Sequence, residues 1–325
     1  MTKAIRFSQT GGAEVLKFEG IELGSPKDGE VRVRHTAVGV NFIDIYHRSG
    51  LYKLPLPSGL GLEGAGVVES VGQGVTRFRE GDRIAYASGP IGAYSQAANV
   101  VANRAVKIPA GVSDELAAAT LLKGLTAHYL LRRTYRVKAG DTILFHAAVG
   151  GVGMIAVQWA KSLGATVIGT VGNERKMELA RRLGCDHVII AAQENVASRV
   201  REITNGKGVP VAYDSIGRDT FMGTMDSLSP LGLFVSFGNA SGPVPPFDAA
   251  VLAQKGSLYF TRPTLANYVT TPEELDVGAG ELFELMARGT IRKNDPKRFP
   301  LSQAAEAHRA LESRQTTGSL ILIPD

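Results

Sequence analysis

The first 124 residues alternate apolar and polar positions in short segments, the pattern of half-buried β-strands. Three such segments lie at residues 30–34, 66–71 and 83–87, each beside a turn signal such as Gly81-Asp82. Apolar residues recur at helical spacing in this region only at residues 41–49 and 113–126. The N-terminal region is therefore predicted to be rich in β-structure.

From residue 142 the pattern changes to strands that alternate with helices. Residues 142–145 are apolar, and the following residues to 163 carry apolar side chains at helical spacing until Gly164 marks a stop. A second strand at 166–171 precedes a helix at 174–183, which Gly184 ends. Further strands are predicted at 188–190, 209–213, 233–237 and 257–260. Six strands in this alternation predict a parallel, doubly wound sheet.

After Pro263 the pattern is helix, loop, helix and strand. The last strand, at 319–323, has no helix after it and fits best as a strand that returns to the N-terminal β-structure. The expected fold is therefore α/β, with a β-rich domain at 1–124 and 265–325. A Rossmann domain at 125–264 is expected to be inserted within it.

A glycine-rich turn at 147–153, Ala-Ala-Val-Gly-Gly-Val-Gly, lies between the first strand of the sheet and its helix. Glycines here allow a tight turn, a close approach of the backbone to a pyrophosphate, and close packing of helix on strand. The pyrophosphate then meets free N–H groups at the positive end of the helix dipole. We therefore expect Gly150, Gly151, Val152 and Gly153 to bind a dinucleotide.

The residues at the end of the second strand indicate which dinucleotide binds. A site for NAD usually places an acidic residue there, to hold the ribose hydroxyls. Gly172 occupies this place, and Arg175 and Lys176 follow it, so a 2′-phosphate has room and two nearby cations. This favours NADPH over NADH, although solvated cations in a first helical turn would give the same sequence.

Composition and charge argue against several classes of site and location. The net charge is +5 and the pI about 9.3, but the 36 Lys and Arg residues are dispersed in runs of at most two, which argues against a nucleic-acid arm. The single cysteine, Cys185, excludes an intrachain disulfide and a cysteine-rich zinc site. With no apolar stretch near the roughly 20 residues of a membrane span, a cytoplasmic location is expected.

The segment Gly61-Leu62-Glu63-Gly64 resembles the Gly-His-Glu signature of zinc-dependent alcohol dehydrogenases. Leu62 stands where the ligating His would be, and Asn41 stands where a ligating Cys would be. Neither is a usual zinc ligand, so no metal is expected. Without a Lewis acid to stabilise an alkoxide, acceptors that delocalise the new charge, such as quinones and α,β-unsaturated carbonyls, become the expected substrates.

Taken together, several motifs resemble the zinc-lacking quinone oxidoreductases of the medium-chain dehydrogenase/reductase superfamily, relatives of ζ-crystallin, over essentially the whole chain. These motifs lie at 41–44, 48–52, 122–126, 147–153, 213–217, 236–239 and 261–263. The resemblance implies a GroES-like catalytic domain, a Rossmann coenzyme domain and a homodimer. The dimer would form through the sheet edge near residues 257–260.

The resemblance also implies the site residues. Asn41 and Tyr46 are expected to be catalytic, and Tyr46, Tyr52 and Arg48 to contact substrate, with Lys123 a weaker candidate. The residues expected to bind NADPH are Asn41, Thr126, Gly150, Gly151, Val152, Gly153, Gly172, Lys176, Ser215, Phe237, Gly238, Ser241, Arg262 and Arg314. One departure is Ala191, where close relatives place a Tyr beside the adenine ribose phosphate.

The hypothesis for the mechanism is direct hydride transfer from NADPH to a bound quinone, with Asn41 and Tyr46 orienting the ring or donating to the developing oxyanion. Tyr46 could instead be an ordinary half-buried helix residue. The nearest alternative activity is reduction of enones, 2-alkenals or enoyl thioesters with the same cofactor. A second alternative is a non-catalytic RNA-binding or structural protein of ζ-crystallin type, against which the intact glycine turn and the phosphate-site cations argue.

Overall fold

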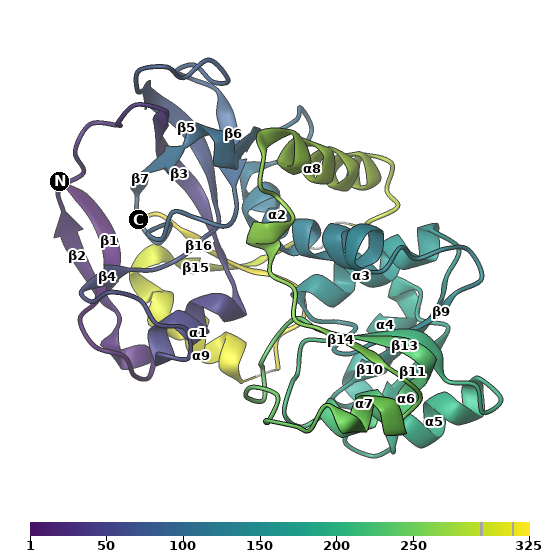
Figure 1. The fold of residues 1–325 in the computed structure, drawn as a ribbon. Helices are drawn as coiled ribbons and strands as arrows, with labels where there is room; N and C mark the ends of the chain where they lie inside the picture. The colour runs from purple at the N-terminus through teal and green to yellow at the C-terminus, as the bar shows by residue number, and fades with distance from the viewer. Residues whose placement is uncertain (293–294, 314) are drawn as a thin grey trace. The chain divides into compact units, whose positions relative to one another are not determined.

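The structure is a computed structural model that describes residues 1–292, 295–313 and 315–325 (Figure 1). The chain forms two compact units. The β-rich unit comprises Met1–Leu125, Val269–Ala287 and the described residues from 295 onward, and the parallel-sheet unit comprises Thr126–Tyr268 and Arg288–Arg292. The expected domain limits at 124/125 and 264/265 stay a prediction.

In the β-rich unit the main sheet has the strand order β15-β16-β3-β5-β6-β8, and β7 also pairs with β3. The long strand β3 pairs antiparallel with β5 on one side, and β16 pairs antiparallel with its end, with Leu320 opposite Val40. The prediction that the C-terminal strand returns to this sheet is confirmed (Figure 1). The strands are β3 (Glu30–Val40), β5 (Gly64–Val71), β6 (Arg83–Tyr86), β7 (Ala97–Val101), β8 (Ala105–Lys107), β15 (Lys297–Pro300) and β16 (Leu320–Ile323).

A smaller sheet, of order β2-β1-β4, and three helices complete this unit. Its core consists of inward-facing apolar side chains such as Val31, Val33, Ile84 and Leu320, each at most 1% exposed. The elements are β1 (Thr2–Phe7), β2 (Lys17–Ile21), β4 (Ser58–Gly59), α1 (Phe42–Ser49), α8 (Pro272–Ala287) and α9 (Ala304–Glu312). A fourth helix, α2 (Asp114–Tyr129), begins in this unit and ends in the parallel-sheet unit.

The parallel-sheet unit contains six parallel strands in the order β11-β10-β9-β12-β13-β14, which confirms the predicted doubly wound sheet. Its central strands are buried on both faces, so they read as continuous apolar runs rather than alternating ones. The strands are β9 (Thr142–Phe145), β10 (Thr166–Val171), β11 (His187–Ile190), β12 (Val209–Asp214), β13 (Leu228–Ser236) and β14 (Tyr259–Thr261).

The helices of this unit are α3 (Gly151–Ser162), α4 (Met177–Leu183), α5 (Val196–Ile203), α6 (Phe221–Ser227) and α7 (Ala250–Gln254). Several predicted limits differ, among them the strand predicted at 233–237, which is Leu228–Ser236. The helix predicted at 174–183 is a 3₁₀ turn at Glu174–Lys176 followed by α4. The strand predicted from residue 257 begins at Tyr259, because Ser257 has a left-handed φ of 57° that extended backbone does not accommodate. No helix in the described part of the chain is long and apolar enough to cross a membrane.

Candidate functional site

The glycine-rich turn connects β9 to α3 as expected. Ala147 has a left-handed φ of 52°, and Gly150 is the N-cap of α3, its N–H bonded to the Ala147 oxygen at 2.8 Å. A Cβ on Gly153 would overlap the Ala147 carbonyl oxygen and lie 2.8 Å from the Ala148 oxygen. Gly153 therefore permits close packing of helix on strand. The first N–H groups of α3 have no acceptor within the helix and can meet an anion.

The end of β10 leaves room for a bulky group. Gly172 is exposed, and a Cβ there would meet no atom within 4 Å. Arg175 is exposed, whereas Lys176 is half-buried, and desolvation lowers the pKa of its ammonium group. Ala191, directly after β11, is exposed and donates its N–H to Val171 at 3.0 Å. Arg314 lies outside the described residues.

Two loops at the ends of β12 and β13 lie against each other. The Phe237 N–H donates to the backbone oxygen of Asp214 at 2.8 Å, and the Ser241 hydroxyl donates to the backbone oxygen of Ile216 at 2.9 Å. A Cβ on Gly238 would lie 2.5 Å from the Ser215 oxygen, so glycine is required there. The structure thus brings together four predicted cofactor residues, Ser215, Phe237, Gly238 and Ser241. Arg262 also reaches this edge, since it donates to the Ser236 oxygen at 3.1 Å.

A buried polar network under these loops was not expected from the sequence. Asp214, fully buried, accepts hydrogen bonds from the Thr220 hydroxyl at 2.6 Å and the Thr224 hydroxyl at 3.1 Å. Thr224 also lies 3.0 Å from His146 Nε2, and His146 Nδ1 lies 3.2 Å from the Thr170 hydroxyl. Burial lowers the pKa of His146, so the ring is neutral. The network ties the ends of β9, β10 and β12 to α6.

In the β-rich unit, Asn41 is the N-cap of α1 and is 5% exposed. Its Nδ2 donates to Glu63 Oε2 at 2.8 Å, and its backbone N–H donates to Asp44 Oδ2 at 2.8 Å. Glu63 is fully buried and also lies 3.4 Å from the Lys123 ammonium group. Asn41 and Lys123, both candidates from the sequence, therefore contact the same carboxylate. No role for Glu63 was predicted from the sequence.

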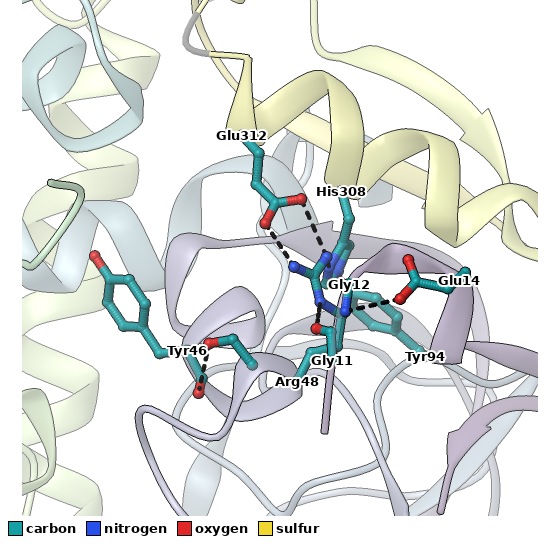
Figure 2. A network of polar contacts seen from close by, with 9 residues as sticks. Gly11, Gly12, Glu14, Tyr46, Arg48, Tyr94, His308 and Glu312 are labelled. Carbon is teal, nitrogen blue, oxygen red and sulfur yellow. Dashed lines mark hydrogen bonds and ion pairs between the residues drawn. The ribbon is translucent and has the colours of Figure 1, made fainter. Parts of the chain in front are cut away.

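Tyr46 and Tyr52 lie side by side after Asn41. Their ring centroids are 5.2 Å apart in an edge-on arrangement, and the Tyr52 backbone N–H donates to the backbone oxygen of Tyr46 at 2.9 Å. Tyr46 is 8% exposed, so most of its surface packs within the protein. Figure 2 shows its ring turned away from the cluster around Arg48. Thr126, in α2, is 7% exposed.

Arg48 lies in a different environment from Tyr46 (Figure 2). Its side chain is 3% exposed and forms a bidentate ion pair with Glu312 of α9, at 2.5 and 3.1 Å. It also donates to the Gly11 oxygen at 3.1 Å and lies 3.2 Å from His308 Nδ1. These contacts fix α1, α9 and the N-terminal segment to one another. They give Arg48 a structural role, and the expected substrate contact stays a prediction.

The cluster continues inward to Asp44. The neutral His308 ring lies 3.0 Å from the Tyr94 hydroxyl through Nε2, and Tyr94 donates to Asp44 Oδ2 at 3.0 Å. Burial lowers the pKa of His308 to about 3 and raises the pKa of Asp44 to about 7. At neutral pH, Asp44 is therefore near the midpoint of its titration.

Replacing Asp44 by asparagine is expected to change how stability depends on pH. The native carboxyl holds its proton up to about pH 7, whereas the unfolded one releases it near pH 4, so its contribution is complete below pH 4 and is lost as the pH rises through 7. The difference in unfolding free energy between the parent protein and Asp44→Asn should therefore shrink by up to about 1.4 kcal/mol per pH unit between pH 4 and 7.

Urea unfolding at pH 5, 6, 7 and 8 measures this difference. Asp28→Asn, at an exposed aspartate, is the matched control and should show no such trend. A constant difference across the series would contradict the expectation.

No group of three or more His, Cys, Asp and Glu side chains within residues 1–292, 295–313 and 315–325 is arranged to hold a metal ion. The positions that resemble zinc ligands carry Asn41, bonded to Glu63, and the apolar Leu62.

Comparisons with known proteins indicate the family of this chain. Residues 27–110 match the alcohol dehydrogenase GroES-like domain family, and residues 151–272 match the zinc-binding dehydrogenase family. The chain is 55% identical to a quinone oxidoreductase of Pseudomonas aeruginosa, over the full length of both. It is 46% identical to a 2-haloacrylate reductase of a Burkholderia species, covering all of this chain and 99% of the relative. The crystal structure of Escherichia coli quinone oxidoreductase complexed with NADPH matches all of both chains at 50% identity and a TM-score of 0.98.

Proposed function

Because this chain belongs to the quinone oxidoreductase family of the medium-chain dehydrogenase/reductase superfamily, we propose that it is an NADPH-dependent quinone reductase that transfers hydride directly to the quinone. The observation that carries the proposal is the glycine turn before α3. Gly153 has no Cβ to overlap the backbone of Ala147 and Ala148, and the first N–H groups of α3 are available to the expected pyrophosphate. Relatives named quinone oxidoreductase at 50–55% identity support the substrate class.

The residues of the parallel-sheet unit fit NADPH. An open position at Gly172 gives the 2′-phosphate space, and Lys176 and Arg175 supply positive charge beside it. Ser215, Phe237, Gly238, Ser241 and Arg262 converge at the carboxyl ends of β12 and β13, the edge at which doubly wound sheets bind ligands. Thr126 and Arg314 complete the proposed cofactor set.

NADPH, when bound, supplies the hydride. Asn41 and Tyr46 are the proposed catalytic residues, and Tyr52 lies against Tyr46 to shape the substrate side. The Asn41 amide is held by Glu63 and can donate to the quinone oxygen on which negative charge develops. Positioning in a site with little water then supplies most of the rate enhancement.

The test is anaerobic NADPH oxidation at 340 nm with a quinone, in parallel with NADH, an enone and a simple alcohol. We expect quinone-dependent oxidation that favours NADPH and does not change when a chelator is added. Asn41→Ala should lower turnover on the order of 100-fold while the protein stays folded. The absence of NADPH oxidation with every acceptor would refute the proposal.

One observation favours a second substrate class. The 46%-identical relative is named a 2-haloacrylate reductase, and a haloacrylate is a conjugated acceptor like an enone. Turnover of the enone or of 2-chloroacrylate without turnover of the quinone would assign the chain to this class while leaving the cofactor unchanged.

The proposal includes a homodimer in the cytoplasm. The strand β14 is at the edge of the parallel sheet and its Tyr259 is 61% exposed, so the edge can pair with a second copy. Sedimentation equilibrium tests the assembly, and a monomer at micromolar concentration would refute this part.

A further inference from the structure

Glu63 is a buried carboxylate immediately before β5, and each of its oxygens has a donor. Oε1 accepts from the Leu122 N–H at 2.6 Å, and Oε2 accepts from Asn41 Nδ2 at 2.8 Å, with the Lys123 ammonium group 3.4 Å away. The side chain is fully buried. A carboxylate in such a place is costly unless it is paired and hydrogen-bonded, so these three donors account for its being tolerated.

The backbone around Glu63 is shaped to admit this carboxylate. A Cβ on Gly39 would overlap Glu63 Oε2 and the Ala118 oxygen, so only glycine fits on β3 at this point. The Gly39 N–H also donates to the Glu63 backbone oxygen at 3.1 Å. The carboxylate is thus held in one position by β3, by α2 and by its own backbone.

Its position decides how the Asn41 amide is oriented. A carboxylate only accepts hydrogen bonds, so the Nδ2 end of the amide must face Glu63 and the amide cannot turn over. The backbone of Asn41 is fixed at the start of α1, because its N–H donates to Asp44 Oδ2 at 2.8 Å and its backbone oxygen accepts from the Asp44 N–H at 3.0 Å. One hydrogen of the Asn41 Nδ2 group is then left in a fixed direction.

We propose that Glu63 is a positioning residue for hydride transfer: it holds the Asn41 amide so that its remaining N–H donates to the carbonyl oxygen of the hydride acceptor. Lys123 balances the charge of Glu63 in this arrangement. The inference rests on the proposed function, because the acceptor is the quinone or conjugated carbonyl proposed above.

The sharpest variant is Glu63→Gln. The Leu122 N–H, only 2.6 Å away, requires the glutamine oxygen on its side, so the glutamine NH₂ group would face Asn41 Nδ2 and Lys123, donor against donor. Asn41 must then rotate. We expect kcat for quinone reduction to fall about 30- to 100-fold, while KM for NADPH changes less than about twofold. Glu69→Gln, in the strand β5 that follows Glu63 and at an exposed ion pair with Arg34, is the matched control and should keep full activity.

A double-variant cycle separates positioning from a general structural effect. If Glu63 acts through Asn41, then Glu63→Gln combined with Asn41→Ala should be no slower than Asn41→Ala alone. Losses that multiply in the double variant would overturn the proposal. If Glu63→Gln does not fold, Glu63→Asp serves in its place, because it keeps the charge but withdraws the carboxylate by one methylene group and should lower kcat in the same direction.

A readout that needs no cofactor uses the side-chain amide resonances of Asn41 in the ligand-free protein, assigned from their loss in Asn41→Asp. Glu63→Gln should shift both proton resonances of this NH₂ group, and Glu69→Gln should leave them unchanged. Unchanged resonances in Glu63→Gln would overturn the positioning role. If the parent protein oxidises no NADPH with any acceptor, the proposed function fails, yet this measurement still decides whether Glu63 orients the amide.

Discussion

Replacing Gly153 by alanine is expected to abolish measurable NADPH binding and to lower the free energy of unfolding by about 1–3 kcal/mol. The added Cβ would overlap the Ala147 oxygen and lie 2.8 Å from both the carbonyl carbon and the oxygen of Ala148. All three atoms belong to the backbone, so no side-chain rotation can relieve the contact. The start of α3 would have to move away from β9, and the N–H groups that face the pyrophosphate would move with it.

A glycine elsewhere in the parallel-sheet unit provides the control. Gly223 lies in α6, and a Cβ there would meet no atom within 4 Å. Gly223→Ala should therefore retain NADPH affinity and gain up to about 1 kcal/mol from the better helix propensity of alanine. Calorimetric titration with NADPH and urea unfolding measure both quantities. Equal NADPH affinities in the two variants would contradict the role given to Gly153.

The parts of the fold that the sequence predicted well are those in which a local pattern carries the information. Residues 142–145 and 166–171 are strands with the predicted limits, because short apolar runs between glycine turns are typical of strands buried on both faces. The strand predicted at 30–34 is instead Glu30–Val40. From Ala37 to Val40 the alternation fades, because every residue there is buried and both faces of β3 are covered.

The glycine turn could be recognised because its function depends on spacing within seven consecutive residues. Glu63 could not be given a role in this way, because its bond to Asn41 joins residues 22 positions apart that meet only when β3 and β5 pair. His308 and Tyr94 are 214 positions apart, and no periodicity in either segment points to the other. The ion pair of Arg48 with Glu312 could not be predicted for the same reason, since the two residues are 264 positions apart.

Replacing Asp214 by asparagine is expected to lower the free energy of unfolding by about 1–3 kcal/mol and to weaken NADPH binding about tenfold. Asp214 Oδ1 accepts from the Ile216 and Gly217 N–H groups at 2.7 and 3.1 Å, and an asparagine oxygen can keep these bonds. Its Oδ2 accepts from the hydroxyls of Thr220 and Thr224, and an NH₂ group in that place would oppose both donors.

The hydroxyl hydrogens of Thr220 and Thr224 would have to turn away from residue 214. This change would also affect the loops that carry the proposed cofactor residues. Thr224 is also bonded to His146, the residue directly before the glycine turn, so a turned Thr224 hydroxyl disturbs the hydrogen bonds of that neutral ring. The same carboxylate anchors the loop that contains Ser215. Stability and cofactor affinity should therefore fall together.

Asp219→Asn in the same loop is the matched control, because the Asp219 side chain is exposed. Urea unfolding and NADPH titration of both variants measure the two effects. If Asp214→Asn lost stability but kept its NADPH affinity, the network would serve only the folding of the parallel-sheet unit. If it matched Asp219→Asn in both measurements, the hydroxyls would have reoriented at no cost, and the charge of Asp214 would have no part in shaping the loops. A loss of both would instead tie the shape of the proposed cofactor site to a buried carboxylate that makes no contact with solvent.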